Sequence, residues 1–225
     1  MLSFNQFLNE GINDPSIFKA VFLAGGPGSG KSFVVGKTAL TALGYKVVNS
    51  DDAFENAMKK AGMTMDPEDI FSDKGQVIRG KAKVLTGKKQ QQYITGRLGL
   101  VIDGTGKDYD KIRKQRDMLE KLGYETAMIF VNTDKETALQ RNKARERSLP
   151  DDQVVKMWNS VQSNIGKFQG TFGQNLYIVD NSNGADINQG TLRAYREIQR
   201  WSKTPPRNGL ARKWIKQEKK KRNIK

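Results

Sequence analysis

Gly25-Gly26-Pro27-Gly28-Ser29-Gly30-Lys31-Ser32 is the stretch that decides the fold of this chain. It matches G-x-x-x-x-G-K-[ST], a loop whose backbone N–H groups surround the phosphates of a nucleotide. The apolar run 18–24 before it predicts a buried strand, and Ser32 to Leu43 predicts the helix that follows. Such a helix points its free N–H groups and positive dipole end at the phosphates. The order strand, loop, helix therefore indicates a nucleotide-binding α/β domain.

Four more short apolar runs predict the remaining strands of a parallel sheet, and helical patterns separate them. The predicted strands are 45–49, 98–103, 125–132 and 176–180. The predicted helical stretches are 53–63, 66–97, 110–122, 134–147, 153–165 and 186–201. Glycines at 75, 80, 87 and 96 are expected to interrupt the second stretch, and 166–173 is expected to be a flexible loop. In that loop, Phe168 and Phe172 would pack at the edge of the core or on the adenine.

The chain is long enough for one such domain with appendages, because 225 residues bury one good core. We predict an extension at 1–16, a kinase-like domain at 17–203, and a linker with a basic tail at 204–225. Residues 193–225 hold thirteen Lys or Arg against two Glu, which is +11 of the total +15. The tail would become helical or stay disordered, and it would contact nucleic acid phosphates or an acidic partner.

The residue types absent from the chain restrict its chemistry. It contains no cysteine and no histidine, so disulfides, thiolate chemistry, Cys or His metal sites and histidine-based triads are excluded. A general base must then be a carboxylate, and a metal must be an oxygen-liganded ion such as Mg²⁺. There is no secretory signal and no apolar run of bilayer length, so a soluble, cytoplasmic protein without a membrane partner is expected.

Acidic residues follow two of the predicted strands, where open parallel sheets bind their ligands. Asp51 and Asp52 follow strand 45–49 and are candidates for a base and for a substrate or metal contact. The alternative is that Ser50 or Asp51 caps the helix expected to start near Ala53. Asp103 ends strand 98–103 and would reach Mg²⁺ through water or orient an acceptor, with Thr105 beside it. Residues 103–106 also fit the D-x-x-G motif of GTPases. However, the guanine-reading N-K-x-D motif is absent, so a GTPase is not favoured.

Two arginines four residues apart follow strand 125–132. Arg141 and Arg145 share one face of the predicted helix, with Arg147 just beyond. Planar guanidinium groups at this spacing can clamp phosphate oxygens, although an isolated helix would more often show such a face merely solvated. Directly after strand four of a phosphate-binding domain, the position favours a lid that closes on ATP.

With these residues assembled, the chain resembles the P-loop kinases, and among them the kinase domain of bacteriophage 5′-polynucleotide kinase and the zeta-toxin kinases. The resemblance spans about residues 17–182 and rests on four motifs. These are Gly-Gly-Pro-Gly-Ser-Gly-Lys-Ser at 25–32, Asn-Ser-Asp-Asp at 49–52, Asp-Gly-Thr at 103–105 and Arg-Asn-Lys-Ala-Arg at 141–145. It implies a three-layer P-loop NTPase sandwich with a five-stranded parallel sheet in the order 2-3-1-4-5, a helical lid and transfer of the ATP γ-phosphate to a hydroxyl.

The resemblance also implies roles for particular residues of this chain. Asp51 would be the general base, with Lys31, Arg141 and Arg145 stabilising the transferred phosphate. The expected nucleotide-binding residues are Gly26, Gly28, Ser29, Gly30, Lys31, Ser32, Phe33, Arg141 and Arg145. The expected substrate contacts are Asp52, Arg79, Asp103 and Thr105, and the expected Mg²⁺ contacts are Ser32 and Asp103.

One position departs from the polynucleotide kinase pattern. There an Arg follows the base by three residues and helps to hold the acceptor phosphate, whereas this chain has Phe54, which looks more like the zeta-toxin pattern. A nucleic acid or nucleotide-like acceptor is expected. The candidates are the 5′-hydroxyl of DNA or RNA, a nucleotide sugar, a hydroxymethylated base in phage DNA and another small hydroxyl compound. A nucleic-acid-binding protein that only senses or hydrolyses ATP is the alternative outside the kinases.

The amino-terminal segment carries one further resemblance. Leu8-Asn9-Glu10-Gly11 looks like the sites cut by head-maturation proteases of large tailed bacteriophages. This would imply a phage-encoded protein in the host cell, with packaging into the virion. A short amphipathic helix is the alternative for the same segment.

Overall fold

The structure, a computed structural model, describes residues 11–144 and 148–224. The five strands are all parallel and form one sheet in the order β2-β3-β1-β4-β5. They are β1 (Lys19–Ala24), β2 (Lys46–Val48), β3 (Leu100–Asp103), β4 (Glu125–Asn132) and β5 (Leu176–Asp180). The fold class and strand order predicted from the sequence are confirmed.

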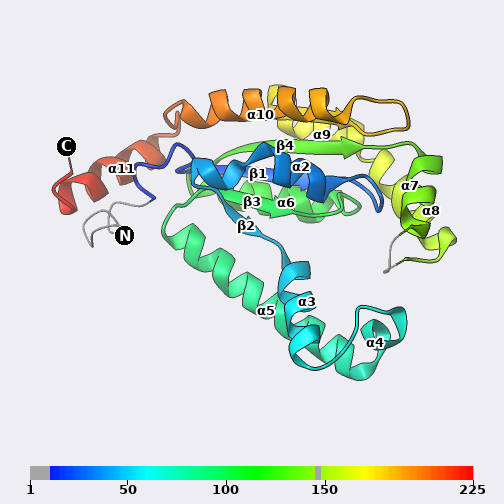
Figure 1. Cartoon of the computed structure of the whole chain (residues 1–225). Helices are drawn as coiled ribbons and strands as arrows, with labels where there is room; N and C mark the ends of the chain where they lie inside the picture. The colour runs from blue at the N-terminus through cyan, green and yellow to red at the C-terminus, as the bar shows by residue number, and fades with distance from the viewer. Residues whose placement is uncertain (1–10, 145–147, 225) are drawn as a thin grey trace.

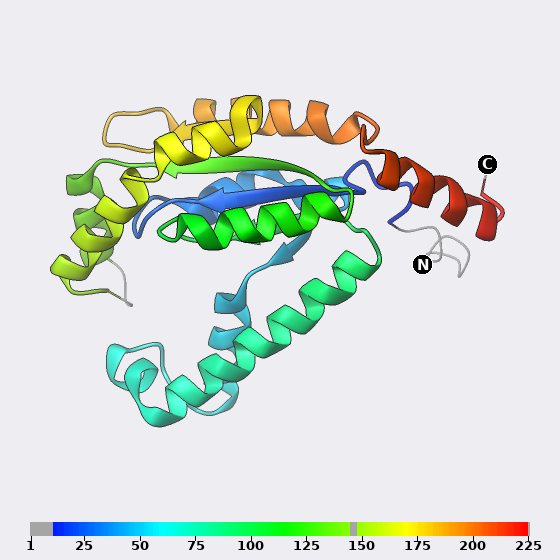
Figure 2. The same cartoon turned by 180° about the vertical axis from the view of Figure 1, so that it is seen from behind.

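Helices cover both faces of this sheet (Figures 1 and 2). On one face lie α2 (Lys31–Thr38), a 3₁₀ turn (Leu40–Leu43) and α10 (Ile187–Lys203). On the other lie α6 (Tyr109–Lys121), α9 (Ile165–Phe172) and a 3₁₀ turn (Gly173–Asn175). Beyond the carboxyl ends of the strands lie α7 (Lys135–Lys143) and α8 (Asp151–Gln162). The result is a three-layer sandwich with its phosphate-binding loop at the carboxyl edge.

Strand geometry explains why the interior has two cores. Successive side chains of a strand point to opposite faces of the sheet. In β1, Ala20 and Phe22 join the core under α6 and α9, whereas Val21 and Leu23 join the core under α2 and α10. Because both faces are covered, every residue of β1 is buried, and the strand is apolar throughout after Lys19.

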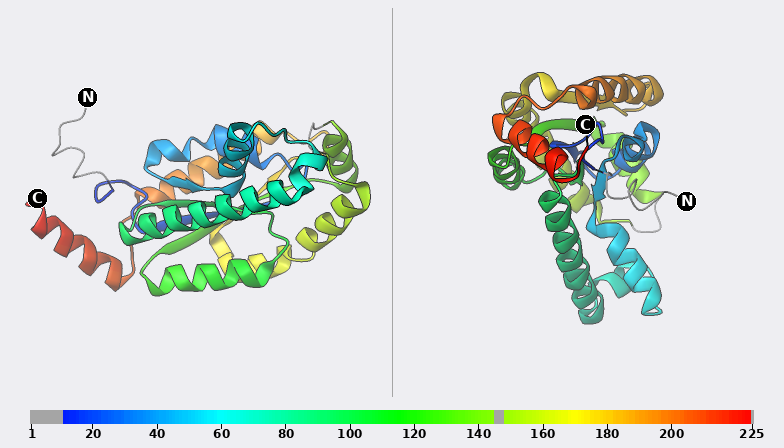
Figure 3. Two further views of the ribbon diagram at one scale, coloured as in Figure 1. Left: turned by 90° about the horizontal axis from the view of Figure 1, so that it is seen from below. Right: turned by 90° about the vertical axis from the view of Figure 1, so that its left-hand side faces the viewer.

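Three helices between β2 and β3 project from the sheet as a separate arm, which we define as residues 50–95 (Figures 1 and 3). They are α3 (Ser50–Lys60), α4 (Pro67–Phe71) and α5 (Asp73–Thr95). The arm has an apolar cluster of its own, made by Phe54, Met58, Ile70 and Ala82. Its cluster is separate from both cores of the sandwich, and near the end of α5 the buried Ile94 joins the arm to the core under α6 and α9.

Two predictions for the arm are wrong in detail. Helix α5 continues through Gly75, Gly80 and Gly87 and ends only at Gly96, because packing along α3 outweighs a cost of about 1 kcal/mol per glycine. At Gly75 an added Cβ would collide with the Asp69 carbonyl oxygen, so the close approach of α4 requires glycine there. Helix α3 begins at Ser50 and not near Ala53.

The segment predicted as a flexible loop at 166–173 is also different. It forms α9, and both of its phenylalanines, Phe168 and Phe172, are buried in the core under α6 and α9. Their four-residue spacing places both rings on one helical face, so burial of that face stabilises the helix despite its glycines. On α10, Leu192 is 46% exposed, whereas Ile198 is fully buried.

The basic tail is helical and packs on the sandwich. Helix α11 (Gly209–Lys221) buries Ala211 and sets the Trp214 ring edge-on to Phe18, with centroids 5.4 Å apart. It lies at the opposite end of the sheet from α7 and α8 (Figure 1). The domain boundaries given above stay predictions, and the expected cleavage segment Met1–Glu10 lies outside the described residues. Among the helices of 11–144 and 148–224, not one has an apolar stretch of bilayer length.

Candidate active site

The glycines of the loop between β1 and α2 allow the backbone to turn closely around a ligand. Gly28 and Gly30 have φ of +74° and +88°, a region that residues with a Cβ rarely adopt. An added Cβ at Gly28 would lie 2.7 Å from the Ala138 carbonyl oxygen, and one at Gly30 would collide with the Asn181 amide. These contacts show that the loop touches both α7 and the end of β5.

Lys31 and Ser32, the last two residues of the phosphate-binding motif, begin helix α2. Lys31 is half-buried, and its Nζ donates to the Gly25 carbonyl oxygen at 2.7 Å. Ser32 is exposed in the same first turn, where a helix supplies free N–H groups. The Gly26 carbonyl accepts from the Ser29 N–H at 3.2 Å. Ser29 is buried, and its hydroxyl has no hydrogen-bond partner among the described residues. This geometry fits the phosphates of a nucleoside triphosphate.

Asn49 joins the two acidic strand ends. Its Nδ2 donates to Asp103 Oδ2 at 3.1 Å, and its Oδ1 accepts from the Asp51 N–H at 2.8 Å, which caps α3. The cap is therefore Asn49, and the suggestion that Ser50 or Asp51 caps this helix is wrong. The carboxylates of Asp51 and Asp52 are left exposed in the first turn. They are available to an acceptor beside the end of β3.

Asp103 connects this acidic group with the phosphate-binding loop. Burial raises its pKa above the ordinary range, and the negative charges of Asp51 and Asp52 raise it further, whereas the Lys31 ammonium lowers it. Its Oδ1 is buried without a hydrogen-bond partner among the described residues. Four charged side chains from β3, α2 and α3 thus interact at one place. The main chain next to them is fixed by the Thr105 carbonyl, which accepts from the Gly25 N–H at 3.1 Å.

The raised pKa of Asp103 predicts that Asp103→Asn is more stable than the parent chain at neutral pH. A carboxyl whose pKa is raised on folding costs stability as the pH rises from its ordinary value of about 4 through its folded-state pKa. The amide carries no such charge, and its oxygen can still accept from Asn49. At pH 7 we expect the free energy of unfolding to be about 1 kcal/mol larger and the Tm about 2–4 °C higher, whereas near pH 3 we expect no difference.

Thermal unfolding followed by circular dichroism at both pH values measures this gain. Asp73→Asn is the matched control, because it makes the same change at an exposed position in the first turn of α5. An Asp103→Asn chain that melts below the parent at pH 7 would contradict the electrostatic account.

Helix α7 lies over the phosphate-binding loop and supplies Arg141. Its Nη1 donates to the Asn181 carbonyl at 3.0 Å and to the Gly28 carbonyl at 3.4 Å. Asp134 begins the helix by accepting from the Thr137 N–H and hydroxyl, and these hydrogen bonds lower its pKa to about 2. Arg145 and Arg147, predicted for the same lid, lie outside the described residues.

A cavity of about 300 Å³ adjoins the loop on the side of α10. It is lined by Gly28, Gly30, Phe33, Arg141, Asn181 and Ile187. The Phe33 ring is 40% exposed and supplies an apolar surface beside the guanidinium of Arg141. Apolar walls with a few polar groups next to phosphate donors suit a nucleoside.

Sequence analysis missed Asn181 and Ile187 in this cavity. Asn181 is buried, and its Nδ2 donates to the Ser29 carbonyl at 2.8 Å, so it links β5 to the loop. Its position directly after the last predicted strand was the available signal, because ligands bind beyond carboxyl strand ends. Ile187 opens α10, and its side chain reaches the cavity only through the packing of that helix on the sheet.

In the arm, Arg79 and Phe54 form one unit. The Arg79 guanidinium lies over the Phe54 ring, 4.8 Å from its centroid, and Phe54 is 1% exposed. Phe54 is therefore a core residue of the arm and not a direct contact of an acceptor. It holds the guanidinium of Arg79, which is half-buried on α5.

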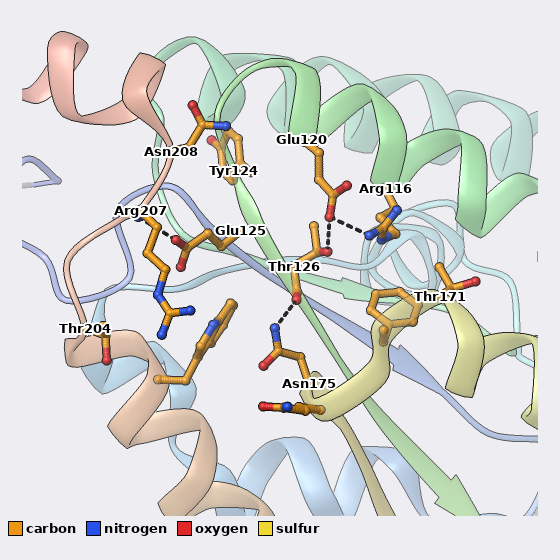
Figure 4. Close-up of a pocket in the computed structure, with 13 residues that line it drawn as sticks. Arg116, Glu120, Tyr124, Glu125, Thr126, Thr171, Asn175, Thr204, Arg207 and Asn208 are labelled. Carbon is orange, nitrogen blue, oxygen red and sulfur yellow. Dashed lines mark hydrogen bonds and ion pairs between the residues drawn. The ribbon is translucent and has the colours of Figure 1, made fainter.

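A larger hollow of about 690 Å³ lies at the end of the sheet opposite the carboxyl ends of the strands, where β4 begins (Figure 4). Its lining includes Arg116, Glu120, Thr126, Asn175 and Arg207. Arg116 pairs with Glu120 at 2.9 Å, and Asn175 donates to the Thr126 carbonyl, so much of its polar surface is used internally. Because it lies far from the phosphate-binding loop, it is not part of the site built by Lys31, Asp51 and Asp103.

Candidate metal ligands were sought among the described residues. In 11–144 and 148–224, no three or more acidic side chains gather closely enough to hold a metal by themselves. Ser32 and Asp103 remain the candidates for Mg²⁺, an ion that usually keeps several waters and uses few protein ligands together with substrate phosphates. The unpartnered Asp103 Oδ1 fits such a contact.

The fold, the loop and the lid define the class of protein: a P-loop NTPase of the kinase type. A family model described as zeta toxin matches residues 10–190. The chain therefore belongs to the zeta toxin family, and the predicted resemblance to P-loop kinases is confirmed. A comparison with curated proteins found no significant match.

Solved structures with the same fold support this class. A protein from the PezAT toxin–antitoxin system of Streptococcus pneumoniae aligns with a TM-score of 0.54 at 15% identity, over 81% of this chain and 85% of that one. A gluconokinase from Sinorhizobium meliloti 1021 aligns at 0.50 and 15%, over 82% and 95%. The AvrRxo1-ORF1:-ORF2 structure with ATP aligns at 0.56 and 15%, over 86% and 70%.

Proposed function

We propose that the chain transfers the γ-phosphate of ATP to a hydroxyl group of a small nucleotide-like acceptor, with a nucleotide sugar as the first candidate. One observation carries this proposal: Asp103 interacts electrostatically both with Lys31 of the phosphate-binding loop and with Asp51, the proposed base. A loop that only bound or hydrolysed ATP would not need exposed carboxylates on the arm.

In the proposed reaction the acceptor hydroxyl loses its proton to the carboxylate of Asp51. The acceptor oxygen bonds to the γ-phosphorus while the bond to the β–γ bridging oxygen breaks, and ADP leaves with that electron pair. Lys31 and Arg141 stabilise negative charge on the phosphate oxygens, and Arg145 is proposed to do the same. Bound Mg²⁺, held by Ser32 and Asp103, would neutralise further charge.

The arm is the proposed acceptor-binding element. Asp52 lies next to the proposed base, and Arg79 would contact an anionic group of the acceptor. Thr105 stands in the loop after β3, on the side that would receive the hydroxyl. The zeta toxin family and the small-molecule gluconokinase neighbour favour a small acceptor over a polymer.

A nucleic acid hydroxyl is the second candidate. The observation in its favour is the exposed cationic surface of α5, which includes Lys81, Lys83, Lys88 and Lys89. Against it, the strongly basic helix α11 lies at the opposite end of the sheet from the carboxyl edge (Figures 1 and 3). A polymer bound to α11 would therefore have to extend along the whole sheet to reach Asp51.

Transfer of label from γ-labelled ATP tests the proposal directly. We expect labelled product with nucleotide sugars and none with 5′-hydroxyl oligonucleotides or modified DNA. Label on oligonucleotides alone would replace the first candidate by the second. ADP release with no labelled product from any acceptor would contradict a kinase and favour an ATP-dependent nucleic-acid-binding protein.

A further inference from the structure

Helix α11 presents an unusually dense set of positive charges. Residues 209–222 contain seven Lys or Arg and one acidic residue, Glu218. Arg212, Lys216 and Lys220 are exposed at four-residue intervals, so they form one row about 12 Å long on the helix. Like charges held so close repel one another, and a dense counter-charge would relieve that repulsion.

The helix is held rigidly against the sandwich. Trp214 packs edge-on against Phe18. Buried Ala211 lies close to Gly123, since a Cβ added at Gly123 would be 3.2 Å from the Ala211 backbone nitrogen. The linker before it is attached by the Arg207 N–H, which donates to Glu125 Oε1 at 2.6 Å. The row of cations is thus preorganised, and binding a partner would cost little conformational entropy.

A shallow groove runs beside this row. It has a volume of about 490 Å³ and an apolar floor that includes Pro206 and Ile215. Arg212, Lys216, Lys219 and Lys220 stand along it. Among the described residues no aromatic ring lines the groove, so this part of the chain offers none of the stacking platforms on which single-stranded bases bind.

We propose that α11 binds the phosphate backbone of duplex nucleic acid, at a surface separate from the ATP site. A duplex carries one negative charge about every 1.7 Å of its axis, a density that matches a rigid row of cations. An acidic protein segment is less dense in charge. The missing aromatic platform disfavours a single strand.

The location makes this a tether and not an acceptor site. The row lies at the end of the sheet where β4 begins, opposite the carboxylates of Asp51 and Asp103. The inference does not depend on the proposed phosphate transfer. Binding is therefore tested without ATP and without an acceptor, so the two proposals can fail separately.

The experiment compares two triple variants of the full chain. Arg212→Gln, Lys216→Gln and Lys220→Gln remove the row, whereas Lys111→Gln, Arg113→Gln and Lys114→Gln remove the same charges from exposed positions of α6. All six side chains are exposed, so both variants should melt like the parent. Fluorescence anisotropy of a labelled duplex DNA of about 20 base pairs gives the affinity over a range of salt concentrations.

We expect the α11 variant to bind about 100-fold or more weakly at about 100 mM salt, and its salt slope to fall by about 2.7, as three lost phosphate contacts predict. The α6 variant should keep the parental slope. Equal losses in both variants, or no duplex binding by the parent at low salt, would overturn the proposal. So would parental binding of polyglutamate at least as tight as that of the duplex, because it would indicate an acidic protein partner.

Discussion

Asp51→Asn is expected to lower phosphate transfer by about 10²- to 10⁴-fold, the usual contribution of a positioned general base. An amide has the shape of the carboxylate but cannot accept the hydroxyl proton. Asp51 lies in the exposed first turn of α3, and the cap of that helix comes from Asn49, so the fold does not depend on the carboxylate. ATP affinity should stay within about twofold.

Rates from labelled ATP and affinities from calorimetry separate these two effects. Glu55→Gln serves as the control, since it removes another exposed carboxylate from the same helix, one that pairs with Lys59 at 2.8 Å. If Asp51→Asn keeps full turnover, the proton goes elsewhere and the assignment of the base is wrong.

Lys31→Ala is expected to have an effect of similar size on transfer, about 10²- to 10³-fold, together with weaker ATP binding. Lys31 lies in the phosphate-binding loop, and its Nζ donates to the Gly25 carbonyl oxygen at 2.7 Å. Its replacement also removes the charge that lowers the pKa of Asp103. The pKa of Asp103 should therefore move still higher in this variant.

Calorimetry with ATP and NMR titration of the Asp103 carboxyl report the two consequences independently. Lys114→Ala, an exposed change on α6, is the matched control. An unchanged Asp103 titration would show that Lys31 and Asp103 do not share one electrostatic site, even if activity is lost.

The parts of the site that are local in sequence could be predicted. Gly25–Ser32 is recognisable because strand, loop and helix follow one another within about 25 residues, and Gly28 and Gly30 adopt positive φ angles that favour glycine. The carboxyl-edge positions of Asp51 and Asp103 follow from the rule that parallel strands end at one edge. Arg141 over the loop follows from the same reasoning, and it contacts Gly28 as expected of a lid.

The parts that depend on packing between distant elements could not be predicted. Asn181 reaches Ser29 across 152 residues, and nothing in its neighbourhood indicates that partner. Phe54 looked like a residue facing the acceptor, whereas it is buried and holds Arg79 from another helix. The glycines at 166, 170 and 173 suggested a loop, but burial of Phe168 and Phe172 on one face outweighs their low helix propensity.

The arm has an apolar cluster separate from both cores of the sandwich, and it occupies one unbroken stretch of the chain. Those two properties make it an exchangeable unit. Arms of other sequence could be grafted between β2 and β3 while β1, its loop and α7 stay as they are, so the compound phosphorylated could change during evolution with little cost to ATP use. The same independence implies that amide hydrogens of α3 and α5 exchange through local opening, well before those of β1 and β4.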